Sequence, residues 1–126
     1  MEKLQITEFV KKSFDKPDEI LDFPGNKLQQ VKLGNFTISR IEFEPGWNWS
    51  ETLPPIIGTE TCQFEHPILM VISGRFAVKM DDDGTTQEFG PGDIGMIPPG
   101  HDAWVVGDEP VTAFDIQVSD PGNKLR

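Results

Sequence analysis

The chain has 126 residues, enough for one domain with its own core, and we expect a single domain over residues 1–126. With 21 acidic and 11 basic residues the formal net charge is −10, and such an acidic protein is repelled by nucleic acids and anionic membranes. No apolar run approaches the length of a membrane span, no segment resembles a signal peptide, and the single cysteine excludes an internal disulfide, so we expect a cytoplasmic protein.

The N-terminal segment predicts one short helix. Over residues 4–14, the apolar side chains of Ile6, Phe9 and Val10 approximate a helical stripe. The proline within residues 15–18 ends this pattern, because proline lacks the N–H group that a continuing helix needs.

The rest of the chain predicts short strands between tight turns. Its 12 glycines and 11 prolines favour frequent reversals and disfavour long helices. Residues 47–58, with two tryptophans and two adjacent prolines, are expected to form a packed loop, and residues 68–72 a strand buried on both faces. The expected strands cover residues 27–33, 35–43, 59–66, 68–72, 75–80, 85–89, 94–97, 103–106 and 111–118. This series predicts an all-β sandwich or barrel.

Two tight turns that enclose one short strand are the most informative segment. Residues 89–100 begin with a Gly-Pro-Gly-Asp turn, continue through a short apolar run and end in a Pro-Pro-Gly turn. Only about five residues lie between the turns, which suits one strand and not a helix. His101 and Asp102 follow, and we expect them at the rim of a small barrel.

This segment resembles the second conserved motif of the cupins, which reads Gly, five residues, Pro, one residue, Gly, two residues, His. Residues 92–100 match it, residues 71–76 resemble the end of the first cupin motif, and residues 43–47 resemble the strand and turn that lead into that motif. The resemblance covers roughly residues 35–118. It implies a double-stranded β-helix, the jelly-roll cupin barrel, with a pocket open at one end, and it implies a homodimer.

The usual metal ligands of cupins are replaced in this chain. In metal-binding cupins the first motif supplies two His and one Glu, and the second motif supplies one His. The Glu position here is Pro67 and the second-motif His position is Ala103. The His-any-His positions fall on Glu60 and Cys62, or on Thr61 and Gln63. We therefore assign no standard metal site, and the family's metalloenzyme activity does not carry over directly.

A substitute set of polar side chains lies near these positions. On an unbroken strand, Glu60, Cys62 and His66 would share one face, and His101 would approach from the facing turn. Such donors suit zinc, iron, nickel or manganese better than magnesium or calcium. The alternative is that Cys62 is a small core residue, that His101 is a solvated turn residue and that Pro67 bends the strand.

Three functions follow as hypotheses. The first is a small-molecule ligand in the barrel pocket, with Cys62, His66, His101, Glu60, Trp49 and Trp104 as the candidate binding residues. The second is a metal-dependent enzyme of the oxygenase or isomerase type, which uses Cys62, His66 and His101 as substitute ligands. The third is a sensory or structural partner protein. The sequence leaves open whether the protein is an enzyme.

Overall fold

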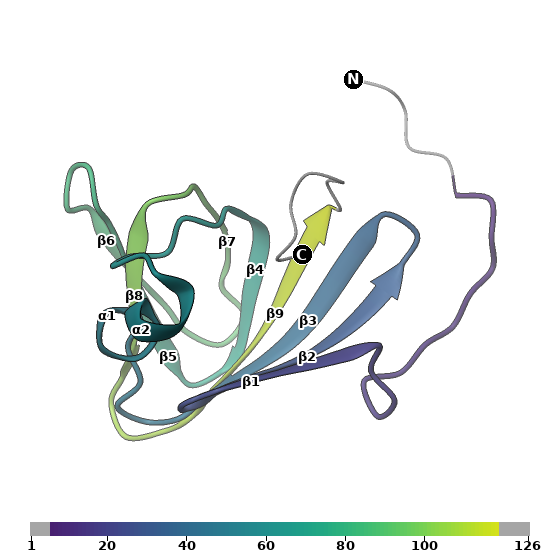
Figure 1. The fold of residues 1–126 in the computed structure, drawn as a ribbon, viewed down its shortest axis with the longest axis horizontal. Coiled ribbons are helices and arrows are strands. Elements are labelled where there is room, and N and C mark those ends of the chain that lie inside the picture. The colour runs from purple at the N-terminus through teal and green to yellow at the C-terminus, as the bar shows by residue number, and fades with distance from the viewer. Residues whose placement is uncertain (1–5, 119–126) are drawn as a thin grey trace.

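The computed structural model describes residues 6–118, which form two antiparallel β-sheets and two short helices (Figure 1). One sheet has six strands in the order β1-β2-β3-β9-β4-β7, and the other has three in the order β6-β5-β8. The elements are β1 (Glu19–Phe23), β2 (Asn26–Leu33), β3 (Phe36–Phe43), α1 (Trp49–Thr52), α2 (Pro54–Ile57), β4 (His66–Ser73), β5 (Arg75–Met80), β6 (Thr86–Phe89), β7 (Ile94–Ile97), β8 (His101–Val106) and β9 (Val111–Val118). The all-β prediction is confirmed.

The long pairing of β3 with β9 joins the two halves of the chain. Phe36 lies opposite Val118 and Phe43 opposite Val111, so the ladder runs the full length of both strands. On its other side β9 pairs with β4, which places β9 inside the six-stranded sheet (Figure 1). The predicted hairpin between β2 and β3 is confirmed, and its turn contains Gly34 with a φ of +56°.

The core lies between the two sheets. The ring of Phe43 from β3 lies 4.6 Å from that of Phe76 in β5 and 4.7 Å from that of Trp47, measured between centroids. Val71 and Val111 are fully buried beside them. Burying one such side chain contributes about 1.5–3 kcal/mol, so this contact between sheets is a main source of stability.

The inner face of the six-stranded sheet also carries polar side chains. The buried polar residues on it are Asn26, Gln30, Thr37, Ser39, Asp115 and Gln117. Along β9, inward and outward residues alternate strictly, and the outward set includes Phe114 and Ile116. Asp115 and Gln117 therefore face the interior, which is unusual for a sheet with one face packed against a core.

The predicted N-terminal helix is wrong for the residues that the structure describes. Residues 6–13 have no regular secondary structure, and Phe9 is fully exposed while Val10 is 48% exposed. A short helix is marginal by itself, and this one has no surface against which to bury its stripe. Packing against the sheet begins further on, where the ring of Phe14 stacks on that of Phe114 at 5.6 Å between centroids. Residues 4 and 5 lie outside the described part.

Two strand predictions also need correction. Residues 59–65 form no strand and pair only at Cys62, because this segment crosses from α2 to β4 at the end of the barrel. Residues 68–72 are a strand, but only one face is buried, since Ile68 and Ile72 are each 42% exposed. Strand β1 was not predicted, and it pairs with β2 along its whole length.

The outer face of β4 and β7 is apolar and exposed. Besides the two isoleucines of β4, it presents Ile94 at 64% and Met96 at 83% exposure. Among residues 6–118, neither short helix has the length and apolar character of a membrane span. The homodimer stays a prediction.

The turn between β4 and β5 tests how tightly the two sheets are joined. Gly74 has a φ of +80°, and a Cβ there would lie 2.3 Å from the carbonyl oxygen of Pro110. A Cβ added at Gly34 has no atom within 4 Å, so Gly34→Ala should lower the free energy of unfolding by about 1–2 kcal/mol, through its φ of +56° alone. Gly74→Ala should cost at least about 2 kcal/mol more, because the backbone must move. Urea denaturation measures both values, and equal costs would contradict the close contact.

Candidate metal centre

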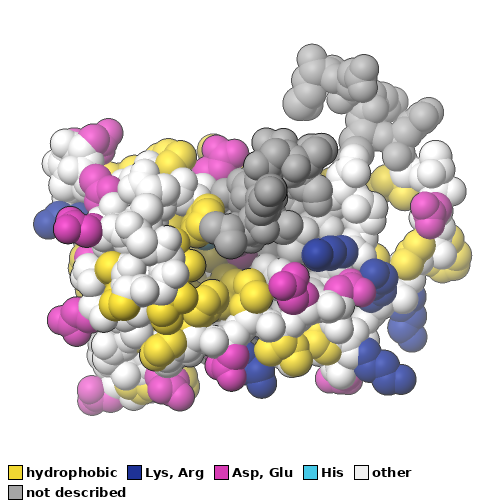
Figure 2. All heavy atoms as spheres, in the orientation of Figure 1, with side chains coloured by type: hydrophobic (Ala, Val, Ile, Leu, Met, Phe, Trp, Pro, Cys, Tyr) yellow, Lys and Arg dark blue, Asp and Glu magenta, His cyan; other side chains and the backbone are white. Residues whose placement is uncertain are grey.

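A cavity of about 150 Å³ lies between the two sheets. The short helices close one side of it with the side chains of Trp49, Leu53 and Ile57. Asn48 caps α1, because its side chain accepts a hydrogen bond of 2.7 Å from the backbone of Glu51. Figure 2 shows hydrophobic side chains gathered between the sheets on this face, with acidic side chains around them.

Cys62 is positioned by its backbone. Its N–H donates to the carbonyl of His101 at 2.7 Å, and the N–H of His101 donates back to the carbonyl of Cys62 at 3.0 Å. The turn before β8, which contains Gly100 with a φ of +86°, brings His101 to this place. Both side chains are only 3% exposed. The Pro-Pro-Gly turn therefore joins the crossing segment to the three-stranded sheet.

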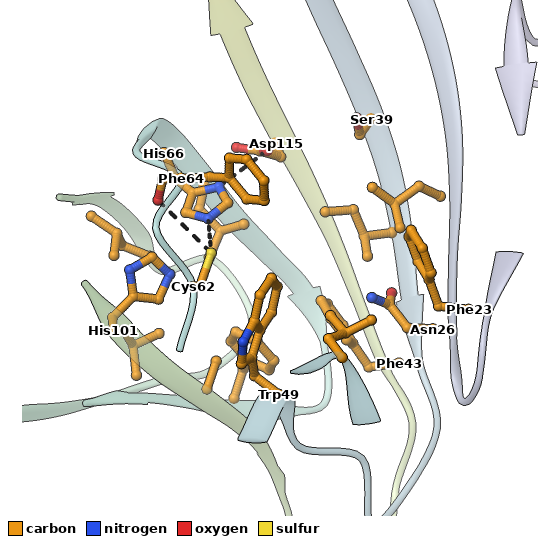
Figure 3. A pocket seen from close by; sticks show the side chains of 18 of the residues that line it. Phe23, Asn26, Ser39, Phe43, Trp49, Cys62, Phe64, His66, His101 and Asp115 are labelled. Carbon is orange, nitrogen blue, oxygen red and sulfur yellow. Dashed lines mark hydrogen bonds and ion pairs between the residues drawn. The ribbon is translucent and has the colours of Figure 1, made fainter. Parts of the chain in front are cut away.

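His66 completes the group from the other sheet. It is the first residue of β4, and its Nε2 lies 3.8 Å from Sγ of Cys62. The imidazole rings of His66 and His101 lie 5.3 Å apart between centroids at an angle of 62°. Figure 3 shows the three side chains converging at one end of the cavity, with Asp115 behind His66.

Both imidazoles are held by their Nδ1 atoms. Nδ1 of His66 donates to Oδ2 of Asp115 at 3.2 Å, and Nδ1 of His101 donates to the carbonyl oxygen of Pro98 at 2.8 Å. A carbonyl can only accept, so the proton of His101 is on Nδ1. In both rings Nε2 is the nitrogen outside these bonds, and that of His66 lies beside Sγ of Cys62.

The group has unusual proton affinities. Burial by itself raises the pKa of the Cys62 thiol, but the hydrogen bonds with His101 and His66 outweigh it and lower the pKa from 9.0 to about 7. Burial lowers the pKa of His66, yet its bonds to Asp115 and Cys62 raise it from 6.5 to about 9. Between these two values the thiolate and the imidazolium coexist as a buried ion pair.

The donor set fits a transition-metal ion. One ligand atom from each of Cys62, His66 and His101 lies within 4.8 Å of the others. Thiolate and imidazole are the donors preferred by zinc and the later transition metals. Histidine ligands of metals nearly always donate their second N–H to a carboxylate or a carbonyl, as both do here. The residues present therefore fit a divalent ion with three protein ligands.

The structure treats the six predicted site residues differently. It brings Cys62, His66 and His101 together and places Trp49 in the wall of the cavity. Glu60 is exposed and takes no part in the group, because the predicted unbroken strand does not exist. Trp104 is on the opposite face of β8 from His101 and does not line the cavity. The three ligand candidates thus meet through a backbone bridge and not along one strand.

Asp115 was missed in the sequence, although it holds His66. The apolar residues of the last strand drew attention to the other face of that strand, and the buried face carries Val111, Ala113, Asp115 and Gln117. The sequence did contain a signal for the burial of Asp115. In an alternating strand it lies on the same face as Val111 and Ala113. Gln117 donates to Oδ2 of Asp115 at 2.8 Å and so supports the carboxylate.

The metal-free protein should show a thiolate whose pKa depends on Asp115. We expect the ultraviolet absorbance of the Cys62 thiolate to rise with a midpoint near pH 7. In Asp115→Asn the imidazolium of His66 loses its anionic partner, so the pKa of His66 falls and that of Cys62 rises by about one unit or more. Glu60→Gln is the control and should leave the midpoint in place. An unchanged midpoint in Asp115→Asn would contradict the coupling.

Comparison with known proteins identifies the fold. No protein-family model matches the chain, and no curated protein matches it in sequence. A protein of unknown function from Rhizobium leguminosarum is similar in structure, with a TM-score of 0.63, 20% identity and coverage of 90% of this chain and 100% of that one. A cupin-superfamily sugar phosphate isomerase from Silicibacter pomeroyi has a TM-score of 0.61 and 19% identity, with coverage of 89% and 77%.

Oxalate decarboxylase from Bacillus subtilis is also similar, with a TM-score of 0.58 and 20% identity over 82% of this chain. The chain spans only about 28% of the length of that enzyme. At such identities the likeness concerns the fold, and the activities named for these proteins are their own. The strand order, the two facing sheets and these likenesses agree with the motif resemblance: the chain has the fold of the cupin superfamily.

Proposed function

We propose that the protein is a metal-dependent enzyme that binds a small molecule in its barrel cavity at a divalent ion held by Cys62, His66 and His101. One observation carries this proposal: three donor atoms converge while both imidazoles are anchored through Nδ1. Of the functions that the sequence left open, this is the one in which all three residues act as metal ligands. Zinc, iron and nickel suit these donors better than manganese, because thiolate is a soft ligand.

Three protein ligands favour catalysis over a purely structural role. Structural zinc sites use four protein ligands, whereas catalytic sites keep one position for water or substrate. The same three side chains line the cavity, so an ion held by them would be accessible to a molecule bound there. When bound, a divalent ion supplies a Lewis acid that polarises an oxygen of the substrate or lowers the pKa of bound water.

The protein's own residues prepare this site. Asp115 fixes the orientation of His66, and Pro98 fixes that of His101. Trp49 and Phe64 lie edge to face at 6.4 Å and line the cavity beside the cluster. Their apolar rings limit the access of water, which strengthens electrostatic interactions inside the cavity.

A second candidate is supported by a specific arrangement of the same residues. Cys62, His66 and Asp115 follow one another like the members of a nucleophilic triad, with Nε2 3.8 Å from Sγ and Nδ1 3.2 Å from the carboxylate. This reading leaves His101 without a role, and the N–H of Cys62 is already bonded to a carbonyl and not free to bind an oxyanion. We therefore rank it below the metal centre.

Metal content separates these candidates. Protein purified without added metal or chelator should contain about one equivalent of zinc, iron, nickel or manganese by elemental analysis. After the metal is removed, addition of Co²⁺ should produce a charge-transfer absorption band from the Cys62 thiolate to cobalt. Cys62→Ser should lose the band, and His101→Gln should lose most of the affinity. Glu60→Gln, with its exposed side chain two positions from Cys62, is the matched control and should behave as the wild type.

The position of Asp115 adds a graded test. Asp115→Asn should weaken metal binding by about 10- to 100-fold without abolishing it, as the loss of a residue that orients a ligand does. The metal centre is wrong if the wild type contains less than about a tenth of an equivalent of metal and its melting temperature does not rise when Zn²⁺ or Co²⁺ is added. If His101→Gln then leaves the thiol as reactive as before, the nucleophilic triad becomes the better account.

A further inference from the structure

The cavity carries buried polar atoms that the protein itself leaves without partners. Within the described chain, Oδ1 of Asn26, Oδ1 of Asp115 and Nε1 of both Trp47 and Trp49 have no hydrogen-bond partner. All four residues line the cavity and are more than nine-tenths buried. A buried polar atom without a partner costs about 1–3 kcal/mol, and native structures contain few of them. Four residues with such atoms around one cavity point to a ligand that pairs with at least some of them.

These atoms define what the ligand must offer. The two oxygens accept hydrogen bonds, and the two indole N–H groups donate them. A hydroxyl group can do both, because it has one donor hydrogen and two acceptor lone pairs. Figure 3 shows Asn26 on the far side of the cavity from Cys62 and the two histidines, with Trp49 between them.

The charge of the wall excludes anionic ligands. None of the residues that line the cavity is a lysine or an arginine. A carboxylate or phosphate group transferred into this apolar space would need such a partner. His66 lies in this wall, but its imidazole is already bonded to Asp115 and Cys62.

The size of the cavity limits the ligand further. Its volume is about 150 Å³, and an apolar cavity of that volume accommodates benzene. Most of its wall is apolar and includes Phe23, Phe43 and Phe64, which suit the face of a ring. A molecule much larger than one six-membered ring would have to displace the short helices that cover the cavity.

We propose that the cavity selects an uncharged molecule of about one six-membered ring that bears a hydroxyl group, and that it rejects carboxylates and phosphates of the same size. The proposal rests on the proposed function in taking the cavity as the binding site. It does not depend on the metal, since the unpaired atoms and the absence of lysine and arginine from the wall are features of the protein itself. A preference for uncharged ligands would distinguish this protein from structural neighbours that are named for anionic compounds, an oxalate decarboxylase and a sugar phosphate isomerase.

Three probes with one ring test the selectivity. Phenol, benzoate and phenyl phosphate are titrated at neutral pH into metal-stripped and Co²⁺-loaded protein, and the shifts of backbone amide signals are followed by NMR. We expect phenol to shift the signals of β2 and β9 in both forms, with benzoate and phenyl phosphate at least about tenfold weaker. Anions that bind as well as phenol, or phenol that leaves these signals unchanged in both forms, would overturn the selectivity.

Two variants connect the selectivity to named atoms. Asn26→Leu, similar in shape, should weaken phenol binding by about two- to tenfold, because one hydrogen bond is lost. Thr37→Val is the matched control, since the hydroxyl of Thr37 is also buried and unpaired but does not line the cavity. Equal effects of the two variants would refute the role of Asn26.

The Co²⁺ band recorded on the same samples keeps the two proposals apart. Cobalt binding without phenol binding refutes the ligand class alone. Phenol binding without cobalt binding supports the ligand class and refutes the metal centre.

Discussion

The pairing of β9 with both β3 and β4 is the interaction on which the rest of the structure depends. It connects strands that are far apart in the chain and places the last strand inside the six-stranded sheet (Figure 1). A one-residue slip would turn Asp115 outward and Phe114 inward, since side chains alternate along a strand. The same ladder therefore fixes the fold and delivers the carboxylate that holds His66.

The interior of this protein combines two conflicting demands. A core gains stability by burying apolar side chains, and the contact of Phe43 with Phe76 does so between the sheets. The neighbouring cavity buries a thiol, two imidazoles and a carboxylate, which lose hydration there. Their mutual hydrogen bonds offset part of this loss, and the remaining polar atoms stay unpaired. Stability is thus given up in one region, as is common at functional sites.

The chain has the cupin fold, but the residues at the positions of the usual cupin metal ligands are different. Pro67 and Ala103 stand where the motifs supply Glu and His, and Ala103 lies in the wall of the cavity. The cluster found in the structure lies close to those positions but is reached differently, through the backbone pairing of Cys62 with His101. A motif count alone would have excluded a metal site. The fold supplies a cavity at this place, and the local chain path decides which side chains enter it.

Much of the architecture followed from local patterns. The Gly34 turn, the alternation along residues 75–80 and the Gly-Pro punctuation around residues 89–100 predicted strands that the structure contains. Such signals are reliable because turns and alternation depend on the backbone preferences of a few adjacent residues. The helix over residues 4–14 was wrong, because a helical stripe is stable only where another surface covers it.

The sequence by itself determined the fold class and drew attention to Cys62, His66 and His101 as a set. Only the tertiary structure decided that they meet, that Glu60 and Trp104 stay outside, and that Asp115 belongs with them. The reason is physical. Residues 62, 66, 101 and 115 come from a crossing segment and three strands, and their proximity results from pairings across long stretches of chain. No local preference encodes such pairings, because they are selected by how the two sheets pack together.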